Sequence, residues 1–190
     1  FDNNFIQKDG ICCWDYARIL KNIKEVFAKA GTLGSSPSCF GIDTWGVDYG
    51  LLDGEGRLID ETRAYRNSSD GEMKAAWEKV SKRSLFDRTG IAALNFNTVY
   101  QLYRRVLEED PALKNARALL FMPDLLGYSL TGVKRSEYTI ASTSGLLDVR
   151  TGGWAYDIMG QLSIPEGLFM PLDMPGTLRG TLLPEVASEL

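Results

Sequence analysis

The decapeptide GIDTWGVDYG, residues 41–50, combines two carboxylates with glycines and a tryptophan. Asp43 and Asp48 flank Trp45 and Gly46, and an apolar-Asp-x-x-Gly pattern can end a strand with amides free to bind an anion. Its carboxylate could then hold a metal-bound water. The pattern is common, however, and taken alone it favours Asp43 and Asp48 as turn residues at the end of a strand.

Two further polar clusters occur later in the sequence. Asn95 and Asn97 in NFNTVYQ precede a helical pattern, where they could cap the helix or bind a polyol through amides that both donate and accept hydrogen bonds. Residues 138–144 are dense in hydroxyl groups and are followed by Asp148. That pattern favours a turn and cap region rich in Ser and Thr.

The composition limits which chemistry is available. The 190 residues contain no histidine, which excludes an imidazole base, a Ser-His-Asp or Cys-His nucleophile and a His-ligated zinc site within them. Three cysteines, two of them adjacent, give neither a disulfide framework nor a metal-ligand spacing. Catalysis would need carboxylates, hydroxyls, amides, or groups supplied from outside these residues.

Charge and hydropathy limit which classes of binding partner the sequence predicts. The net charge is -4 and no Lys/Arg run is long enough to follow a phosphate backbone, so no nucleic-acid partner is predicted. No apolar stretch approaches the ~20 residues of a membrane span, and no signal-like start is present. We therefore expect a cytoplasmic protein without a membrane partner. Because the chain starts with Phe1, we expect it to be part of a longer protein.

Local patterns predict strands early in the chain. Apolar residues at helical spacing over 16–27 predict an amphipathic helix, with Asp15 as N-cap and Gly31 as its stop. The loop that follows should lead into a strand over residues 39–44. Residues 53–56, DGEG, have the composition of a hairpin turn, and RAYRN, residues 63–67, predicts a short extended piece.

Helices are predicted in the rest of the chain. They cover residues 70–84, 98–109 and 123–130, and no later segment alternates like a strand. Thr98 and Gln101 fit a capping box, Pro111 should end the second helix, and Gly132 should follow the third. Strands followed by helices indicate an α/β or α+β fold whose sheet is completed by other residues.

Several motifs together resemble one protein family. GIDTWGVDYGLLDGEGRL, AYRNS, TGIAALNFNTVYQL, LLFMPDLLGYSLTG, EYTIASTSGLLD and GTLRG occur in the order found in the rhamnulokinase branch of the FGGY carbohydrate kinases. DTWGVD and FNTVYQL are specific to that branch, and the resemblance covers nearly the whole chain. Departures at YRNSSD and IAALN leave the identity of the ketose open.

The resemblance implies a fold and a division of labour. It implies an α/β, ribonuclease H-like (actin-like ATPase) fold, with residues 1–190 forming an N-terminal, sugar-binding domain that is incomplete at both ends. A separate C-terminal nucleotide-binding domain would be its partner. The full-length enzyme would use ATP and Mg²⁺ to phosphorylate L-rhamnulose to L-rhamnulose 1-phosphate, with the catalytic aspartate downstream of Leu190 and a first phosphate loop upstream of Phe1.

The resemblance also implies substrate-binding residues. Gly46, Trp45 and Asn97 would face the sugar, because a glycine lets backbone approach a ligand and an indole can cover an apolar sugar face. The chain alone should be inactive and should bind neither ATP nor a metal well. Two alternatives remain open: a non-catalytic sugar-binding or regulatory module, and a related kinase for another ketose or polyol.

Overall fold

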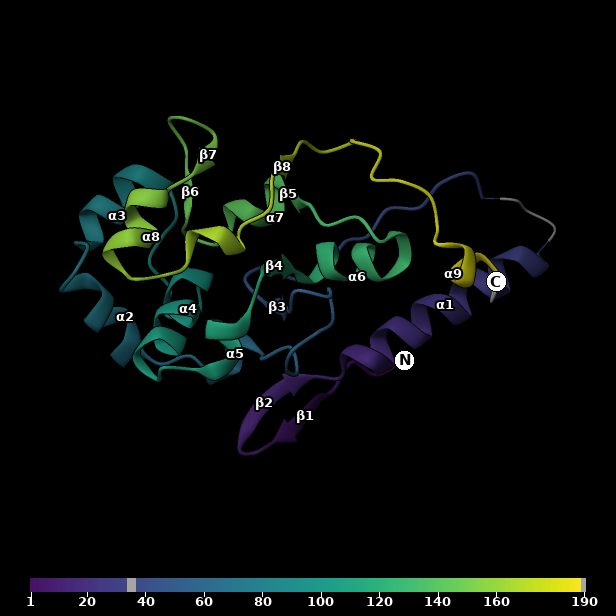
Figure 1. Cartoon of the computed structure of the whole chain (residues 1–190), viewed down its shortest axis with the longest axis horizontal. Helices are drawn as coiled ribbons and strands as arrows, with labels where there is room; N and C mark the ends of the chain where they lie inside the picture. Colours follow the sequence, from purple (N-terminus) through teal and green to yellow (C-terminus); the bar gives the residue numbers. More distant parts are fainter. Residues whose placement is uncertain (34–36, 189–190) are drawn as a thin grey trace.

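A computed structural model describes residues 1–33 and 37–188 of the chain. Figure 1 shows a central strand pair with helices on both sides and one long helix extending away from it. The helices are α1 Tyr16–Thr32, α2 Asp70–Trp77, α3 Lys82–Thr89, α4 Thr98–Leu107, α5 Pro111–Asn115, α6 Met122–Thr131, α7 Tyr138–Ser142, α8 Tyr156–Gln161 and α9 Pro184–Ser188. Short 3-10 helices cover η1 Tyr65–Asn67 and η2 Glu166–Leu168.

The strands of the described residues form four two-stranded sheets. The antiparallel pairs are β1 Phe5–Lys8 with β2 Ile11–Trp14, β3 Tyr49–Leu52 with β4 Ala118–Phe121, and β6 Leu147–Asp148 with β7 Gly153–Trp154. The parallel pair is β5 Ser136–Glu137 with β8 Leu172–Asp173. The β3/β4 pair, with Gly50 opposite Leu120, lies at the centre of the fold.

Both faces of the β3/β4 pair are buried, and each contributes to a separate hydrophobic cluster. Alternate residues point to opposite sides of a strand. Leu51 and Leu119 therefore join the cluster built with α4 and α8, whereas Leu52 and Leu120 join the one built with α1 and α6. Gly50 allows α6 to pack closely, since a Cβ there would lie 2.6 Å from a methyl carbon of Leu125.

Several local predictions are confirmed. Helix α1 begins after Asp15, whose carboxylate accepts a hydrogen bond from the Arg18 amide, and ends at Thr32, one residue beyond Gly31. The turn at residues 53–56 reverses the chain after β3, so that Leu58 forms a single antiparallel bridge with Leu52 at the end of that strand. Gly132 follows α6 with a φ of 74°.

The strand predicted over residues 39–44 is wrong. These residues have no regular secondary structure and pair with no strand of the described residues. The strand β3 begins at Tyr49 instead, and its partner β4 was missed. Four residues of continuous apolar sequence before a helix do not distinguish a buried strand from the helix itself.

Four predictions for residues 63–111 need correction. The helix over 70–84 is two helices, because residues 78–81 interrupt it and Ser81 caps α3 through its hydroxyl. In the piece predicted to be extended over 63–67, Arg63 forms a single antiparallel bridge with Cys13, but residues 65–67 are a 3-10 helix. Pro111 begins α5 instead of ending α4, which stops at Leu107. No capping box forms at Thr98, since the Gln101 side chain makes its hydrogen bonds elsewhere.

Candidate sugar-binding turn

A strained turn lies immediately before β3. The amide of Asp48 donates to the carbonyl of Gly46 at 2.9 Å, which closes a three-residue turn around Val47. Val47 has a φ of 68°, a value that β-branched residues rarely adopt. Such strain persists only where surrounding contacts fix the backbone, and it is frequent at functional sites.

Side chains from two other segments fix both polar groups of Val47. Its amide donates to Thr143 Oγ1 at 3.1 Å, just after α7. Its carbonyl accepts from Thr98 Oγ1 at 2.7 Å and from Gln101 Nε2 at 3.3 Å, both on α4. The turn is therefore tied to α4 and to the end of α7.

Asp48 is fully buried and surrounded by neutral donors. Its Oδ2 accepts from Trp14 Nε1 at 2.6 Å, Trp45 Nε1 at 3.0 Å and the Tyr65 amide at 3.2 Å. Its Oδ1 accepts from Gln101 Nε2 at 3.2 Å. Burial raises the pKa of Asp48, and the hydrogen bonds from these donors oppose that rise.

Trp45 and Gly46 lie together at this turn and are partly exposed. The Trp45 ring packs against Trp14 in a tilted arrangement with 4.1 Å between ring centroids, so its orientation is fixed by this ring contact as well as by its hydrogen bond to Asp48. A Cβ on Gly46 would lie 3.1 Å from Thr143 Cγ2. The glycine therefore also makes room for the threonine that holds the turn.

Asn97, predicted to contact substrate, is buried and bonded to backbone. Its Oδ1 accepts from the Leu94 amide at 2.9 Å, and its Nδ2 donates to the Thr143 carbonyl at 3.3 Å. The structure thus brings Asn97 close to Gly46 through Thr143. Asn95 is separate from this group and donates to Asp70 at the start of α2.

Sequence reasoning missed three residues that shape the site. Thr98 and Gln101 were interpreted as a capping box, and Thr143 was one hydroxyl among several in residues 138–144. All three hold the backbone of Val47. The density of hydroxyl groups over residues 138–144 was a usable signal, but it does not specify which hydroxyl reaches residues 46–48.

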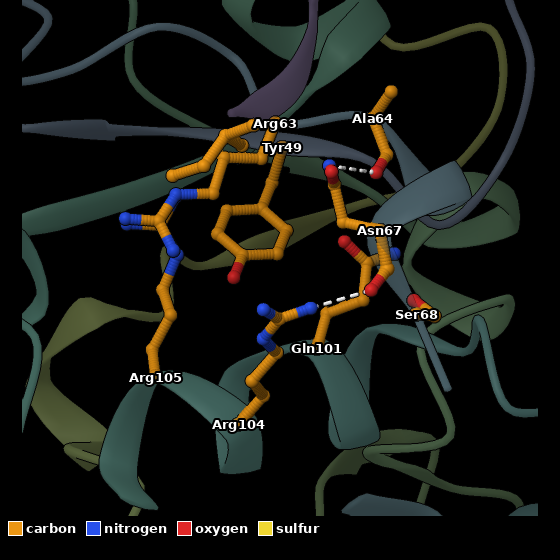
Figure 2. Close-up of a pocket in the computed structure, with 9 residues that line it drawn as sticks. Tyr49, Arg63, Ala64, Asn67, Ser68, Gln101, Arg104 and Arg105 are labelled. Carbon is orange, nitrogen blue, oxygen red and sulfur yellow. Dashed lines mark hydrogen bonds between the residues drawn. The ribbon is translucent and has the colours of Figure 1, made fainter. Parts of the chain in front are cut away.

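A small polar cavity lies beside Gln101, as Figure 2 shows. Its volume of about 30 Å³ has room for about two water molecules at most. Arg63, Arg104 and Arg105 border it, but each is paired with acidic side chains. Those acidic partners are Asp60, Glu72, Glu108 and Asp110. The cavity therefore has the size of a water site. The charges of its arginines are already balanced by carboxylates, so these side chains are not free to bind a phosphate.

A larger hollow of about 320 Å³ lies between α1 and residues 41–45. Its α1 side is mostly apolar, with Ile19, Ile23 and Val26, whereas Asp43, Thr44 and Trp45 line the opposite side. A polyol needs closely spaced donors and acceptors, which the α1 side does not supply. We therefore place the candidate sugar contacts at the turn, where Trp45 also borders this hollow.

The described residues contain neither a cluster of metal ligands nor a membrane-spanning helix. No group of three or more acidic or cysteine side chains among residues 1–33 and 37–188 could hold a metal ion. The three arginines beside the small cavity are paired with carboxylates. Within the same ranges, no helix is long and apolar enough to span a membrane.

Comparison with known proteins identifies the family. The family model for the N-terminal domain of the FGGY family of carbohydrate kinases matches residues 3–190. The chain is 43% identical over 186 residues to a rhamnulokinase of Enterococcus faecalis, and the aligned region covers 96% of this chain and 36% of that protein. It is 39% identical to a rhamnulokinase of Bacillus subtilis, over 96% of this chain and 37% of the relative. The chain thus spans little more than a third of these relatives.

Solved structures show the same fold at low identity. A gluconate kinase from Lactobacillus acidophilus superimposes with a TM-score of 0.89 at 16% identity, over 100% of this chain and 39% of that one. A xylulose kinase from the same organism superimposes with a TM-score of 0.89 at 15% identity, over 100% of this chain and 39% of that one. The predicted α/β fold of a sugar kinase is thereby confirmed. From its match to the family model over nearly its whole length, the chain belongs to the FGGY family of carbohydrate kinases.

Proposed function

We propose that the full-length protein phosphorylates the 1-hydroxyl of L-rhamnulose and that residues 1–190 contribute its sugar-binding side. The observation that carries this proposal is the 43% and 39% identity to two rhamnulokinases, each over 96% of the chain. The branch-specific words DTWGVD and FNTVYQL meet in space, since Gln101 on α4 donates to Val47 and Asp48.

The task of this chain is positioning. Phosphoryl transfer needs the attacking hydroxyl to be held in line, and this can supply much of the rate. Gly46 exposes backbone at a turn that does not need to rearrange, and Trp45 offers a fixed indole beside it. We assign both residues to sugar contact, and we assign Asn97, whose side chain is bonded to backbone, to the support of Thr143 behind Gly46.

The remaining chemistry is assigned to other parts of the protein. ATP would supply the phosphoryl group and Mg²⁺ would neutralise its charge, and the described residues contain no cluster of three or more acidic or cysteine side chains that could hold the metal. We place the ATP and metal sites and the catalytic aspartate outside residues 1–190, with a C-terminal nucleotide-binding domain as partner. We also propose that the enzyme is cytoplasmic.

A substrate panel on the full-length protein tests this function. ADP release would be measured with L-rhamnulose, D-xylulose, L-fuculose, gluconate and glycerol, and kcat/KM should be highest for L-rhamnulose. A higher kcat/KM for another compound of the panel would show that this compound, and not L-rhamnulose, is the substrate. Sugar binding without turnover would contradict the kinase and favour a binding module.

The isolated residues 1–190 provide a second test. They should give no measurable turnover, because losing a general base alone costs ~10²–10⁴ in rate, before loss of the nucleotide site is counted. Robust phosphorylation by this piece would show that the assignment of the chemistry to other residues is wrong.

A further inference from the structure

We propose that Asp48 is a positioning residue for the sugar: it holds the Trp45 indole and the Gly46–Val47 backbone in the geometry that binds the ketose. This inference rests on the proposed function. It concerns a residue that does not touch the substrate and acts through the two neighbours that do.

The first step is the convergence of two indoles on one oxygen. Trp14 and Trp45 both donate to Asp48 Oδ2, at 2.6 and 3.0 Å, and their rings pack 4.1 Å apart. Trp14 belongs to β2 and Trp45 to an irregular segment. The carboxylate thus adds a shared hydrogen-bond acceptor to the ring packing that holds Trp45 against β2.

The second step links the same carboxylate to the turn. Gln101 Nε2 lies within hydrogen-bond distance of Asp48 Oδ1 at 3.2 Å, the Val47 carbonyl at 3.3 Å and the Phe96 carbonyl at 2.9 Å. One amide group therefore contacts both Asp48 and the strained backbone after Gly46. A change at Asp48 should move Trp45 and the turn together.

The third step explains why an acid is needed. All four groups that contact the Asp48 carboxylate are donors. An ionised carboxylate only accepts hydrogen bonds, whereas an asparagine amide would turn an N–H toward one of these donors. Asp48→Asn keeps the volume of the side chain and removes one acceptor, so it tests the network with little change in packing.

A buried aspartate could instead serve stability alone, and Asp148 provides the matched control. Asp148 is also buried and accepts hydrogen bonds from Arg88 Nε and the Arg150 amide, and it contacts none of the residues at the turn. If burial of a carboxylate were all that mattered, Asp48→Asn and Asp148→Asn should have the same kinetic consequences.

The experiment measures melting temperature, kcat and both KM values for the two variants of the full-length enzyme. Loss of a buried hydrogen bond to a charged group predicts a rise in the KM for L-rhamnulose of about tenfold or more in Asp48→Asn. The KM for ATP should stay within about twofold of the wild-type value. Asp148→Asn should lower the melting temperature and leave both KM values unchanged.

Indole N–H resonances give a readout that a general loss of stability would not move. Asp48→Asn should shift the signals of Trp14 and Trp45, assigned through Trp→Phe variants. Trp77 donates to Tyr100 and Trp154 to the Met170 carbonyl, so their signals should stay in place. Unshifted Trp14 and Trp45 signals would overturn the inference.

The kinetic outcomes separate this inference from the proposed function. An unchanged KM for the sugar in Asp48→Asn, or an equal rise for sugar and ATP, would overturn the positioning role while the wild type remains a kinase. If the wild type prefers another ketose, the proposed substrate fails, and a selective rise in the KM for that ketose would still support the role of Asp48.

Discussion

Two buried aspartates are held in opposite ways. Asp48, at the turn before β3, is bound by neutral donors. Asp124, on α6, is 1% exposed and pairs with Arg179 while accepting from the Glu137 amide at 3.1 Å. Arg179 lies in residues 174–183, which form no helix or strand and precede α9. The first carboxylate orders a turn, and the second attaches an irregular segment to the core.

The two sites also differ in how completely their polar groups are paired. Among the described residues, the buried side-chain nitrogen and oxygen atoms without a hydrogen-bond partner in the protein are Ser136 Oγ, Glu137 Oε1 and Arg179 Nη2. All three belong to residues at or next to the Asp124 contacts. None of these atoms belongs to the residues of the turn. Because the turn carries the proposed sugar contacts, we expect substitutions there to change binding. Substitutions around Asp124 should change stability.

The largest expected effect is on stability at Arg179. Arg179→Met would leave Asp124 buried without its cation, and breaking such a pair typically costs about 3–5 kcal/mol. Urea denaturation of the full-length protein at about pH 9, well above the pKa of Asp124, should show this loss in the free energy of unfolding, because protonation cannot then relieve the buried charge cheaply. The KM for L-rhamnulose should not change, because Arg179 contacts none of the residues at the turn.

The double variant Asp124→Asn/Arg179→Met is the control. Removing both charges should recover most of the lost stability, since the cost comes from the uncompensated charge rather than from the missing contact. A single variant as stable as the wild type would show that Asp124 does not depend on Arg179. The contrast with Asp48 would then fail.

Sequence reasoning succeeded where structure depends on neighbours along the chain. Asp15 caps α1, Gly132 follows α6, and residues 53–56 form a turn, because each depends on contacts within a few residues. It failed at β4, whose partner β3 is more than sixty positions earlier in the chain. No local pattern encodes that pairing.

The candidate site shows the same limit. The resemblance selected Trp45 and Gly46, which meet at the turn, but neither periodicity nor spacing indicated the role of Thr143. Gln101 occupied a position typical of a capping box, and tertiary contacts with Val47 and Asp48 prevailed over that local preference. The residues that fix the turn come from segments about 50 and 95 positions away, which one sequence cannot align.

The next effect is a pH dependence at Asp124. Burial raises its pKa from 3.8 to about 6, although Arg179 and the Glu137 amide oppose the rise. A carboxyl with a raised pKa binds its proton more tightly in the folded state, so its contribution favours folding at low pH and is lost as the pH rises from about 4 to 6. The shift corresponds to about 3 kcal/mol.

Asp124→Asn isolates this contribution because the amide does not titrate. The free energy of unfolding of the variant minus that of the wild type should increase between pH 4 and pH 7, by up to about 3 kcal/mol. The titration of the other carboxylates contributes equally to both proteins and therefore cancels in this difference of unfolding free energies. A difference that is independent of pH would show that the pKa of Asp124 is the same in the folded and unfolded states.

The smallest effect compares one methyl group in the two regions. A Cβ on Gly46 would lie 3.1 Å from Thr143 Cγ2, whereas a Cβ on Gly127, in the same helix as Asp124, meets no atom within 4 Å. Gly46→Ala should therefore cost about 1 kcal/mol through crowding. Gly127→Ala should add up to about 1 kcal/mol through helix propensity.

Thr143→Ser completes the test of the turn, because it removes Cγ2 and keeps the hydroxyl that accepts from the Val47 amide. In a double-mutant cycle, Gly46→Ala should cost less when residue 143 is serine, with a coupling of about 0.5 kcal/mol or more. The KM for L-rhamnulose should rise in Gly46→Ala and stay constant in Gly127→Ala. If both alanines stabilise the protein equally, the turn is not tightly packed, and the strain at Val47 must be held by its hydrogen bonds alone.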